Sequence, residues 1–165
     1  MVFKLYNSNI PNSMRLEEKV LKKFIQKGRT LALAESCTGG LIGDHLTNVP
    51  GASAFFHLGI IAYDNAAKTK ILGVAPALIK KYGAVSAPVA RAMAEGARKM
   101  LNTDLALSVT GIAGPAGATK DKPVGLVFIA LSSKSRTTAH QFLFKGSRTD
   151  IKKQAAQTAL KMLAK

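Results

Sequence analysis

The sequence contains little of what marks a disulfide scaffold, a metal centre or a membrane protein. Cys37 is the only cysteine among 165 residues, which excludes an internal disulfide framework. Cys37 and the three histidines (His45, His57 and His140) show no metal-ligand spacing, so we predict no metal site and no cofactor. No apolar run approaches the roughly 18 residues that a membrane-spanning helix needs, so we expect no membrane association.

Tryptophan is also absent, and aromatic side chains make up only 6% of the sequence. This scarcity argues against a surface that stacks nucleic-acid bases, and no recognition motif for nucleic acid is present. The first fourteen residues, MVFKLYNSNIPNSM, lack the apolar centre and small-residue cleavage site of a signal peptide, so we expect a cytoplasmic protein. The length suits one domain, and a hydrophobic share of 47% is enough for a packed core.

Acidic residues are scarce as well, with 9 Asp and Glu against 24 Lys and Arg, a formal net charge of +15. The excess is uneven: residues 1–30 carry +5, residues 31–97 carry +1 and residues 98–165 carry +9. A high positive charge is typical of proteins that bind nucleic acid or other polyanions. Because no recognition motif accompanies it here, we expect at most non-specific attraction of nucleic acid.

Apolar periodicity predicts strands that alternate with helices. We interpret residues 1–13 as an irregular arm and residues 14–165 as one domain. The late strands resemble an antiparallel pair, which favours a three-layer α/β/α fold with a mixed sheet. Strands are expected over residues 30–34, 55–63, 105–109, 124–132 and 137–144, and helices over about 14–27, 41–46, 64–72, 76–83, 86–101 and 149–163.

Ser36 is the first candidate for chemistry, because it follows a short apolar strand and precedes a glycine pair and a helix. In such a turn the following backbone N–H groups can face an anion or a developing oxyanion. Ser36 is therefore a candidate nucleophile, although the same pattern also fits an ordinary helix cap. The neighbouring Cys37 is a rival nucleophile, but a lone cysteine at such a turn is more often packed and inert.

No histidine is placed to activate Ser36, which leaves a neutral lysine as the base. Lys68 and Lys70 both follow the second strand and lie on opposite sides of the same apolar helix face, so periodicity does not choose between them. Burial of either amine would lower its pKa. Tyr63, at the end of that strand, is placed to position the base or to donate to a substrate.

A glycine-rich segment follows the third strand, in the run TGIAGPAG. Its spacing matches neither the dinucleotide fingerprint nor the Walker A motif, but so many glycines suit the lining of a phosphate or ribose site. Arg148, just before the last predicted helix, is positioned to pair with a phosphate.

Several motifs in this order together resemble a known family. They are LALAESCTGG, GIIAYDNAAKTKILGV, YGAVS, SVTGIAGPAG and KPVG, and they cover about residues 15–164. This combination is similar to the CinA C-terminal domain family, whose characterised members are nicotinamide-nucleotide amidases. The resemblance implies hydrolysis of the carboxamide of nicotinamide mononucleotide (NMN) to nicotinate mononucleotide and ammonia. The N-terminal domain of longer CinA proteins has no counterpart here, so we expect a stand-alone amidase.

The resemblance also implies roles for individual residues. It assigns the nucleophile to Ser36 and the base to Lys68, and so prefers Lys68 over Lys70, with Tyr63 as the tyrosine of the second motif. It further implies a homo-oligomer, a dimer or larger. An alternative is a basic protein of the same fold that binds nucleotides or nucleic acid without amidase turnover. The predicted substrate-binding residues are Thr38, Gly39, Gly40, Asn65, Thr110, Gly111, Ile112, Gly114 and Arg148.

Overall fold

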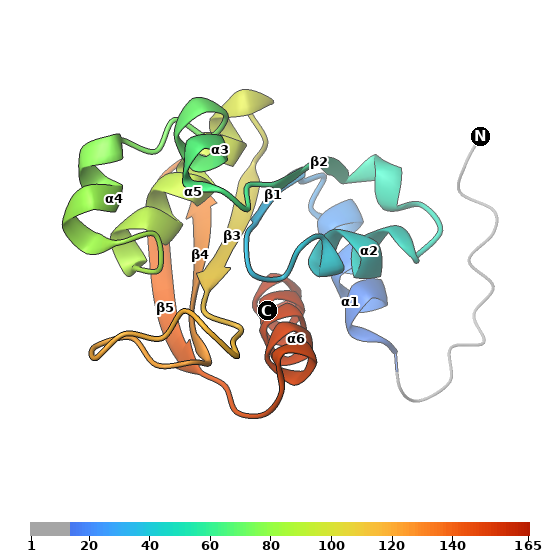
Figure 1. Cartoon of the computed structure of the whole chain (residues 1–165). Coiled ribbons are helices and arrows are strands. Elements are labelled where there is room, and N and C mark those ends of the chain that lie inside the picture. Colours follow the sequence, from blue (N-terminus) through green and yellow to red (C-terminus); the bar gives the residue numbers. More distant parts are fainter. Residues whose placement is uncertain (1–13) are drawn as a thin grey trace.

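The computed structural model describes residues 14–165, and the predicted arm of residues 1–13 lies outside this part of the chain. Five strands form one sheet in the order β2-β1-β3-β4-β5 (Figure 1). β1 pairs in parallel with β2 and β3, whereas β3–β4 and β4–β5 are antiparallel, which confirms the predicted mixed sheet. The strands are β1 (Leu31–Glu35), β2 (Phe56–Ile61), β3 (Leu105–Gly111), β4 (Leu126–Ser133) and β5 (Thr137–Leu143).

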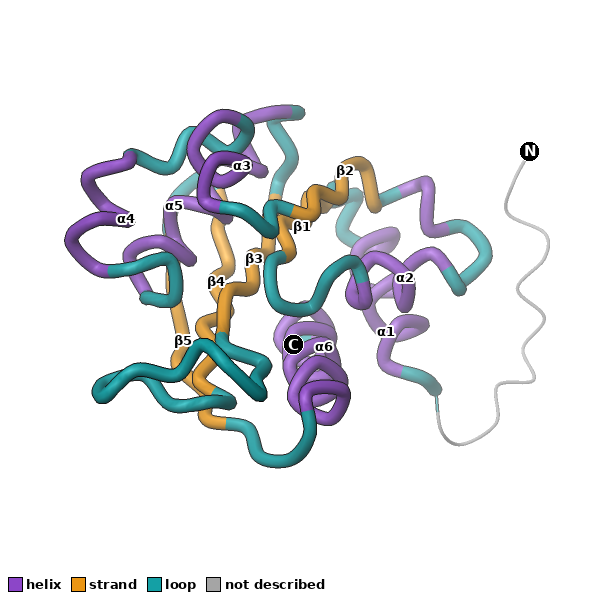
Figure 2. Tube along the Cα trace, viewed as in Figure 1, coloured by secondary structure: helices purple, strands orange, loops and turns teal. Residues whose placement is uncertain are grey.

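Helices cover both faces of the sheet, which confirms the three-layer α/β/α arrangement (Figures 1 and 2). One face carries α1 (Leu16–Gln26), α2 (Leu41–Thr47) and α6 (Arg148–Ala164). The other carries α3 (Asn65–Lys70), α4 (Pro76–Tyr82) and α5 (Ala87–Met100). A short 3-10 helix, η1 (Ala52–Ala54), precedes β2. No helix of the described chain is long and apolar enough to cross a membrane.

β1 is an internal strand of the sheet, between β2 and β3, and it is buried on both faces, as its continuous apolar run predicts. Because side chains alternate along a strand, Leu31 and Leu33 pack into the cluster under α1, α2 and α6. Ala32 and Ala34 face the opposite layer, where they join the cluster formed with α5. The small alanine side chains let α5 pack close to the strand that leads to Ser36.

The topology brings several chain segments to one edge of the sheet. β1, β2 and β3 run in parallel, and β5 has the same direction because β4 is antiparallel to both of its neighbours. The segments that follow these four strands therefore emerge together. Between β1 and β2 the chain passes over one face, and between β2 and β3 it passes over the other. This switch point at the carboxyl ends of parallel strands is where open α/β sheets bind ligands.

Two predicted boundaries differ from the structure at positions that matter for the site. Thr110 and Gly111 are the last residues of β3 rather than loop residues, because they pair with Phe128 and Val127 of the antiparallel strand β4. A Cβ on Gly111 would lie 2.8 Å from the Leu126 carbonyl oxygen, so this pairing requires glycine. The glycine that predicted a loop at this position therefore reflects a close contact between β3 and β4.

Arg148 is the first residue of α6 rather than a residue of the preceding loop. Ser147 is the N-cap: its Oγ accepts a hydrogen bond from the Asp150 N–H, and the Asp150 carboxylate accepts one from the Ser147 N–H at 2.9 Å. This capping box fixes the direction in which α6 begins. The Arg148 side chain is thus carried by a defined helix end.

Candidate active site

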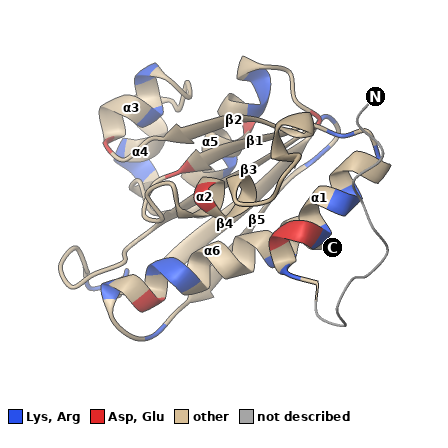
Figure 3. Ribbon diagram, turned by 90° about the vertical axis from the view of Figure 1, so that its right-hand side faces the viewer, with Lys and Arg blue, Asp and Glu red and all other residues tan. Residues whose placement is uncertain are grey.

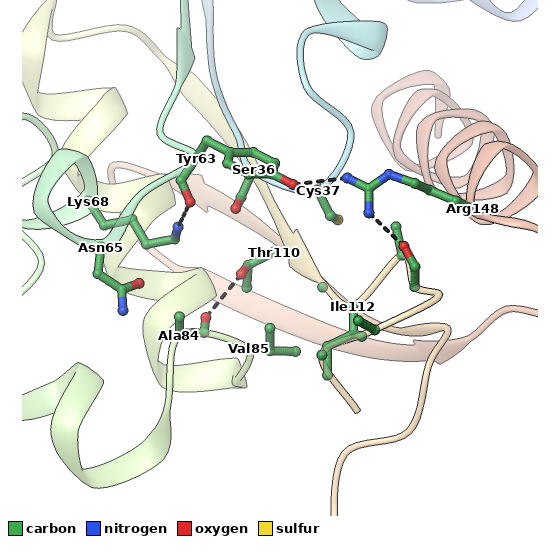
Figure 4. Close-up of a pocket in the computed structure, with 15 residues that line it drawn as sticks. Ser36, Cys37, Tyr63, Asn65, Lys68, Ala84, Val85, Thr110, Ile112 and Arg148 are labelled. Carbon is green, nitrogen blue, oxygen red and sulfur yellow. Dashed lines mark hydrogen bonds between the residues drawn. The ribbon is translucent and has the colours of Figure 1, made fainter. Parts of the chain in front are cut away.

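A pocket of about 230 Å³ lies at the carboxyl edge of the sheet, at the switch point between β1 and β3. Its walls come from the segments after β1, β2 and β3, from the loop between α4 and α5, and from the start of α6 (Figure 4). The structure brings most of the predicted site residues together in this one lining. They are Ser36, Tyr63, Asn65, Lys68, Thr110, Gly111, Ile112, Gly114 and Arg148.

Ser36 directly follows β1 and is only 7% exposed. Its N–H donates to the Val109 carbonyl of β3 at 2.9 Å, so the sheet pairing continues through this residue. Its own carbonyl accepts a hydrogen bond from the Gly39 N–H at 3.1 Å, which closes a tight turn. The Ser36 side chain points into the pocket (Figure 4). Hydrogen bonds therefore fix the backbone N–H and the backbone carbonyl of Ser36, so its hydroxyl is attached to a rigid backbone.

Glu35, the last residue of β1, fixes the other end of the same loop. Its buried carboxylate accepts hydrogen bonds from the N–H groups of Gly40 at 3.0 Å, Ile42 at 3.2 Å and Gly43 at 2.8 Å. These are N–H groups at the start of α2, which have no acceptor within their own helix. Glu35 was not among the residues predicted for the site. The available signal was a carboxylate at the end of an otherwise apolar strand.

Three predicted site residues, Thr38, Gly39 and Gly40, lie outside the pocket lining. The N–H groups of Gly39 and Gly40 donate to Ser36 and Glu35, so they serve the loop itself. The Thr38 hydroxyl is fully buried and has no hydrogen-bond partner among the described residues. Cys37 is the residue of this turn that reaches the pocket beside Ser36, and its N–H donates to no other described residue.

Lys68 is buried, with 2% of its surface exposed. Its Nζ donates to the Ala62 carbonyl at 2.9 Å and to the Tyr63 carbonyl at 3.0 Å. No described carboxylate lies within 4.0 Å of this amine. Burial therefore lowers the pKa of Lys68, although the negative charge of Asp64 opposes the shift.

The hydrogen bonds of Lys68 suit the neutral amine. A neutral amine has two N–H bonds and one lone pair, and the two backbone carbonyls accept both N–H bonds. The lone pair is then left to accept a proton from a third direction. Lys68 extends from α3 toward the pocket into which the Ser36 side chain points (Figure 4). Lys70 is exposed and does not line this pocket, so burial distinguishes two lysines that periodicity leaves equivalent.

Tyr63 contacts Lys68 through its backbone carbonyl rather than through its phenol. The residue is 60% exposed, and its hydroxyl accepts a hydrogen bond from Arg148 Nη2 at 2.9 Å. The phenol proton itself stays available to a ligand, because the hydroxyl acts only as the acceptor in that contact. Tyr63 thus connects the two sides of the pocket, with its carbonyl on the lysine and its hydroxyl on the arginine.

The opposite wall comes from the segment after β3 and from α6. Arg148 Nη1 donates to the Gly114 carbonyl at 2.6 Å, and Gly114 has a positive φ of 77°. Thr110 donates from Oγ1 to the Ala84 carbonyl at 3.0 Å, which ties the end of β3 to the loop before α5. Ala84 and Val85 also line the pocket. They belong to the YGAVS motif, although we predicted no role for them.

Cys37 is packed against the core beneath α2 and α6 and is only 6% exposed. Burial raises the pKa of its thiol to about 12. The thiol is therefore protonated at neutral pH, and a protonated thiol is a poor nucleophile. Of the two neighbouring candidates, the geometry favours the Ser36 hydroxyl, which points into the pocket.

Comparison with known proteins identifies the same region as a defined family domain. The chain is 51% identical over 148 residues to a CinA-like protein of Geobacter sulfurreducens, covering 90% of this chain and 36% of that protein. It is 50% identical over 148 residues to a CinA-like protein of Acidobacterium capsulatum, again covering 36% of the relative. The chain thus spans about a third of the length of these curated relatives.

Solved structures of similar length share the fold. The competence/damage inducible protein CihA from Agrobacterium tumefaciens superimposes with a TM-score of 0.87 at 39% identity, covering 90% of this chain and 91% of that one. A CinA superfamily protein from Escherichia coli gives a TM-score of 0.86 at 29% identity, covering 93% and 91% of the two chains. The model of the CinA C-terminal domain matches residues 13–165. With sequence, fold and domain length in agreement, this chain belongs to the CinA C-terminal domain family.

Proposed function

We propose that this protein hydrolyses the carboxamide of NMN to nicotinate mononucleotide and ammonia through an acyl-enzyme on Ser36. The single observation that carries the proposal is the environment of Lys68. A buried lysine with a lowered pKa, two carbonyl acceptors and no ion pair among the described residues is suited to act as a general base. It shares its pocket with a serine hydroxyl held at the end of β1.

In the first half-reaction, the neutral amine of Lys68 takes the proton of the Ser36 hydroxyl as Oγ bonds to the carboxamide carbon. The carbonyl oxygen becomes an oxyanion, and we assign its stabilisation to the N–H of Cys37, which follows the nucleophile and donates to no other described residue. One such donor contributes about 10²–10³ in rate. Protonated Lys68 then gives its proton to the departing nitrogen, the C–N bond breaks, and ammonia leaves a nicotinoyl ester on Ser36.

In the second half-reaction, Lys68 accepts a proton from water as the water oxygen attacks the ester carbon. The bond to Ser36 Oγ breaks, and the proton returns to Oγ to restore the hydroxyl. The acid product then carries a carboxylate. Lys68 serves as base and acid in each half-reaction, so its neutral form has to be populated in the resting enzyme.

The test is an assay of ammonia and nicotinate mononucleotide formation from NMN by the purified protein. We expect turnover by the wild type and at least about a thousandfold loss in Ser36→Ala, because the acyl acceptor is removed. Cys37→Ala is the matched variant: it removes the rival thiol but keeps the backbone N–H. Full activity in Ser36→Ala would exclude the mechanism, and loss in Cys37→Ala alone would move the nucleophile to that residue.

A further inference from the structure

The flank of α6 beside the Ser36 loop carries a second basic residue in addition to Arg148. Lys152 lies four residues after Arg148, and residues with this spacing occupy the same face of a helix. The position of a Cβ on Gly39 would be 3.6 Å from Lys152 Nζ, so this ammonium lies directly against the loop that follows Ser36. Figure 3 shows basic positions on both sides of an acidic one at this end of α6.

Lys152 has no counter-ion among residues 14–165, which the structure describes. No described carboxylate lies within 4.0 Å of its Nζ, and residues 1–13 contain no Asp or Glu. Its side chain is half-buried between α6 and the loop, and it donates no hydrogen bond to a described residue. An ammonium that lies against the loop without a partner keeps its N–H groups available to bind an anion.

Arg148 also keeps part of its binding capacity. A guanidinium has five N–H groups, and the contacts with Gly114 and Tyr63 use one on each terminal nitrogen. The remaining N–H groups can donate to an anion at the pocket mouth. Arg148 and Lys152 together place two positive charges on consecutive turns of one helix face.

Glu35 prevents the start of α2 from binding an anion. Its carboxylate accepts the N–H groups of Gly40, Ile42 and Gly43 at the start of α2. A substrate phosphate would meet a carboxylate there, and like charges repel. The flank of α6 is therefore the cationic surface beside the pocket that remains open to an anion.

We infer that Lys152, together with Arg148, forms a subsite for the 5′-phosphate of the nucleotide and selects phosphorylated substrates over nucleosides. The inference rests on the proposed function, since it extends the same pocket along its substrate. Lys153 provides a matched control because it is the next residue on α6. It is exposed, and it lies about 100° around the helix from Lys152.

The test uses ribose 5-phosphate, which carries the phosphate but no carboxamide, together with turnover of NMN and nicotinamide riboside. We expect Lys152→Gln to weaken binding of ribose 5-phosphate, measured by calorimetry, by about 10- to 100-fold. The same variant should raise KM for NMN and leave kcat/KM for nicotinamide riboside unchanged. Lys152→Arg should restore binding, and Lys153→Gln should match the wild type.

The outcomes separate this inference from the proposed function. Ribose 5-phosphate binding that depends on Lys152, in a protein that does not release ammonia from NMN, would support the subsite and refute the amidase. Turnover of NMN with equal KM in Lys152→Gln and Lys153→Gln would support the amidase and overturn the subsite. Failure of the wild-type protein to bind ribose 5-phosphate at millimolar concentration would also overturn it.

Discussion

Two loops that leave the same edge of the sheet are built in different ways. The loop after β1, residues 36–40, is short and mostly buried, and three of its backbone N–H groups donate hydrogen bonds to Val109, to Ser36 and to Glu35. The loop after β3, residues 112–125, is longer and is exposed over much of its length, although both loops contain glycines with positive φ. A contact from outside the loop, the hydrogen bond from Arg148 to Gly114, holds its first part.

The difference indicates that the two loops, which form two walls of the pocket, have different roles. A nucleophile has to be held within a fraction of an ångström, and the loop after β1 provides that through hydrogen bonds inside a buried setting. A wall that contacts the remainder of a substrate can be more open and can depend on a movable side chain.

Lys68→Arg should have the largest effect, because it keeps a positive charge but removes the neutral base. An arginine stays protonated at every accessible pH, so we expect at least about a thousandfold loss of kcat. In the wild type, the pKa of Lys68 is lowered by burial, so activity should rise with pH as the amine loses its proton, and level off below the ordinary lysine range. The measurement is a pH profile of kcat/KM for NMN.

Lys70→Arg is the control for this substitution, since Lys70 lies two residues away on the same helix and is exposed. Its pH profile should match that of the wild type. Equal activity in Lys68→Arg and the wild type would show that the buried amine is not the base.

Arg148→Gln should affect the exposed loop after β3 and leave the buried loop after β1 intact. The variant loses a charge and the contacts with Gly114 and Tyr63. Charge-assisted hydrogen bonds contribute about 1.5–3 kcal/mol, so KM for NMN should rise about 10- to 100-fold. Steady-state kinetics with kcat and KM determined separately will show it. A fall in kcat at constant KM would instead place Arg148 on the chemical step.

Glu35→Gln should loosen the buried loop after β1 and lower the stability of the protein. Glutamine can turn its oxygen toward the N–H groups of Gly40 and Ile42, but its NH₂ group then faces the Gly43 N–H. An unsatisfied buried donor costs about 1–3 kcal/mol, and we expect the free energy of unfolding to fall by that amount. Urea denaturation measures this change.

Glu95→Gln is the control for Glu35→Gln, because Glu95 lies on α5 and no described residue donates a hydrogen bond to its carboxylate. It should unfold as the wild type does. If both variants unfold at the same urea concentration, the Glu35 carboxylate does not fix the loop.

Tyr63→Phe should have the smallest effect. It removes an exposed hydrogen bond from Arg148 to the phenol but keeps the backbone carbonyl that accepts from Lys68. A hydrogen bond of this kind contributes about 0.5–1.5 kcal/mol, which corresponds to about a two- to tenfold rise in KM. A loss of kcat similar to that of Lys68→Arg would mean that the phenol takes part in proton transfer.

Local patterns predicted most of the elements correctly. A helix was predicted over about residues 86–101, and α5 occupies this segment, with Ser86 as its N-cap through an Oγ that accepts from the Val89 N–H. The apolar run at residues 30–34 predicted the buried strand β1. Thr110 and Gly111 were placed in a loop because glycine usually marks a turn, whereas their strand pairing depends on β4, which follows after the intervening loop.

Some site residues could likewise be predicted from local sequence, whereas others depend on tertiary contacts. The sequence marked Ser36 through its place between a strand and a glycine pair, and it marked Arg148 through its place near the last helix. It did not mark Glu35 as the group that fixes the loop, since three hydrogen bonds to α2 form only when strand and helix are in place. It also placed Gly39 and Gly40 toward the substrate, whereas their N–H groups serve the loop.

The sequence alone determined the alternation of strands and helices, the mixed sheet and the family, because apolar periodicity, turn residues and ordered motifs are properties of the chain itself. Only the tertiary structure decided which lysine is buried. Lys68 and Lys70 are equivalent on an isolated helix, and they differ because the packing of α3 at the sheet edge removes Lys68 from water and leaves Lys70 exposed. Desolvation depends on neighbours distant in sequence, and so does the lowered pKa on which the proposed chemistry depends.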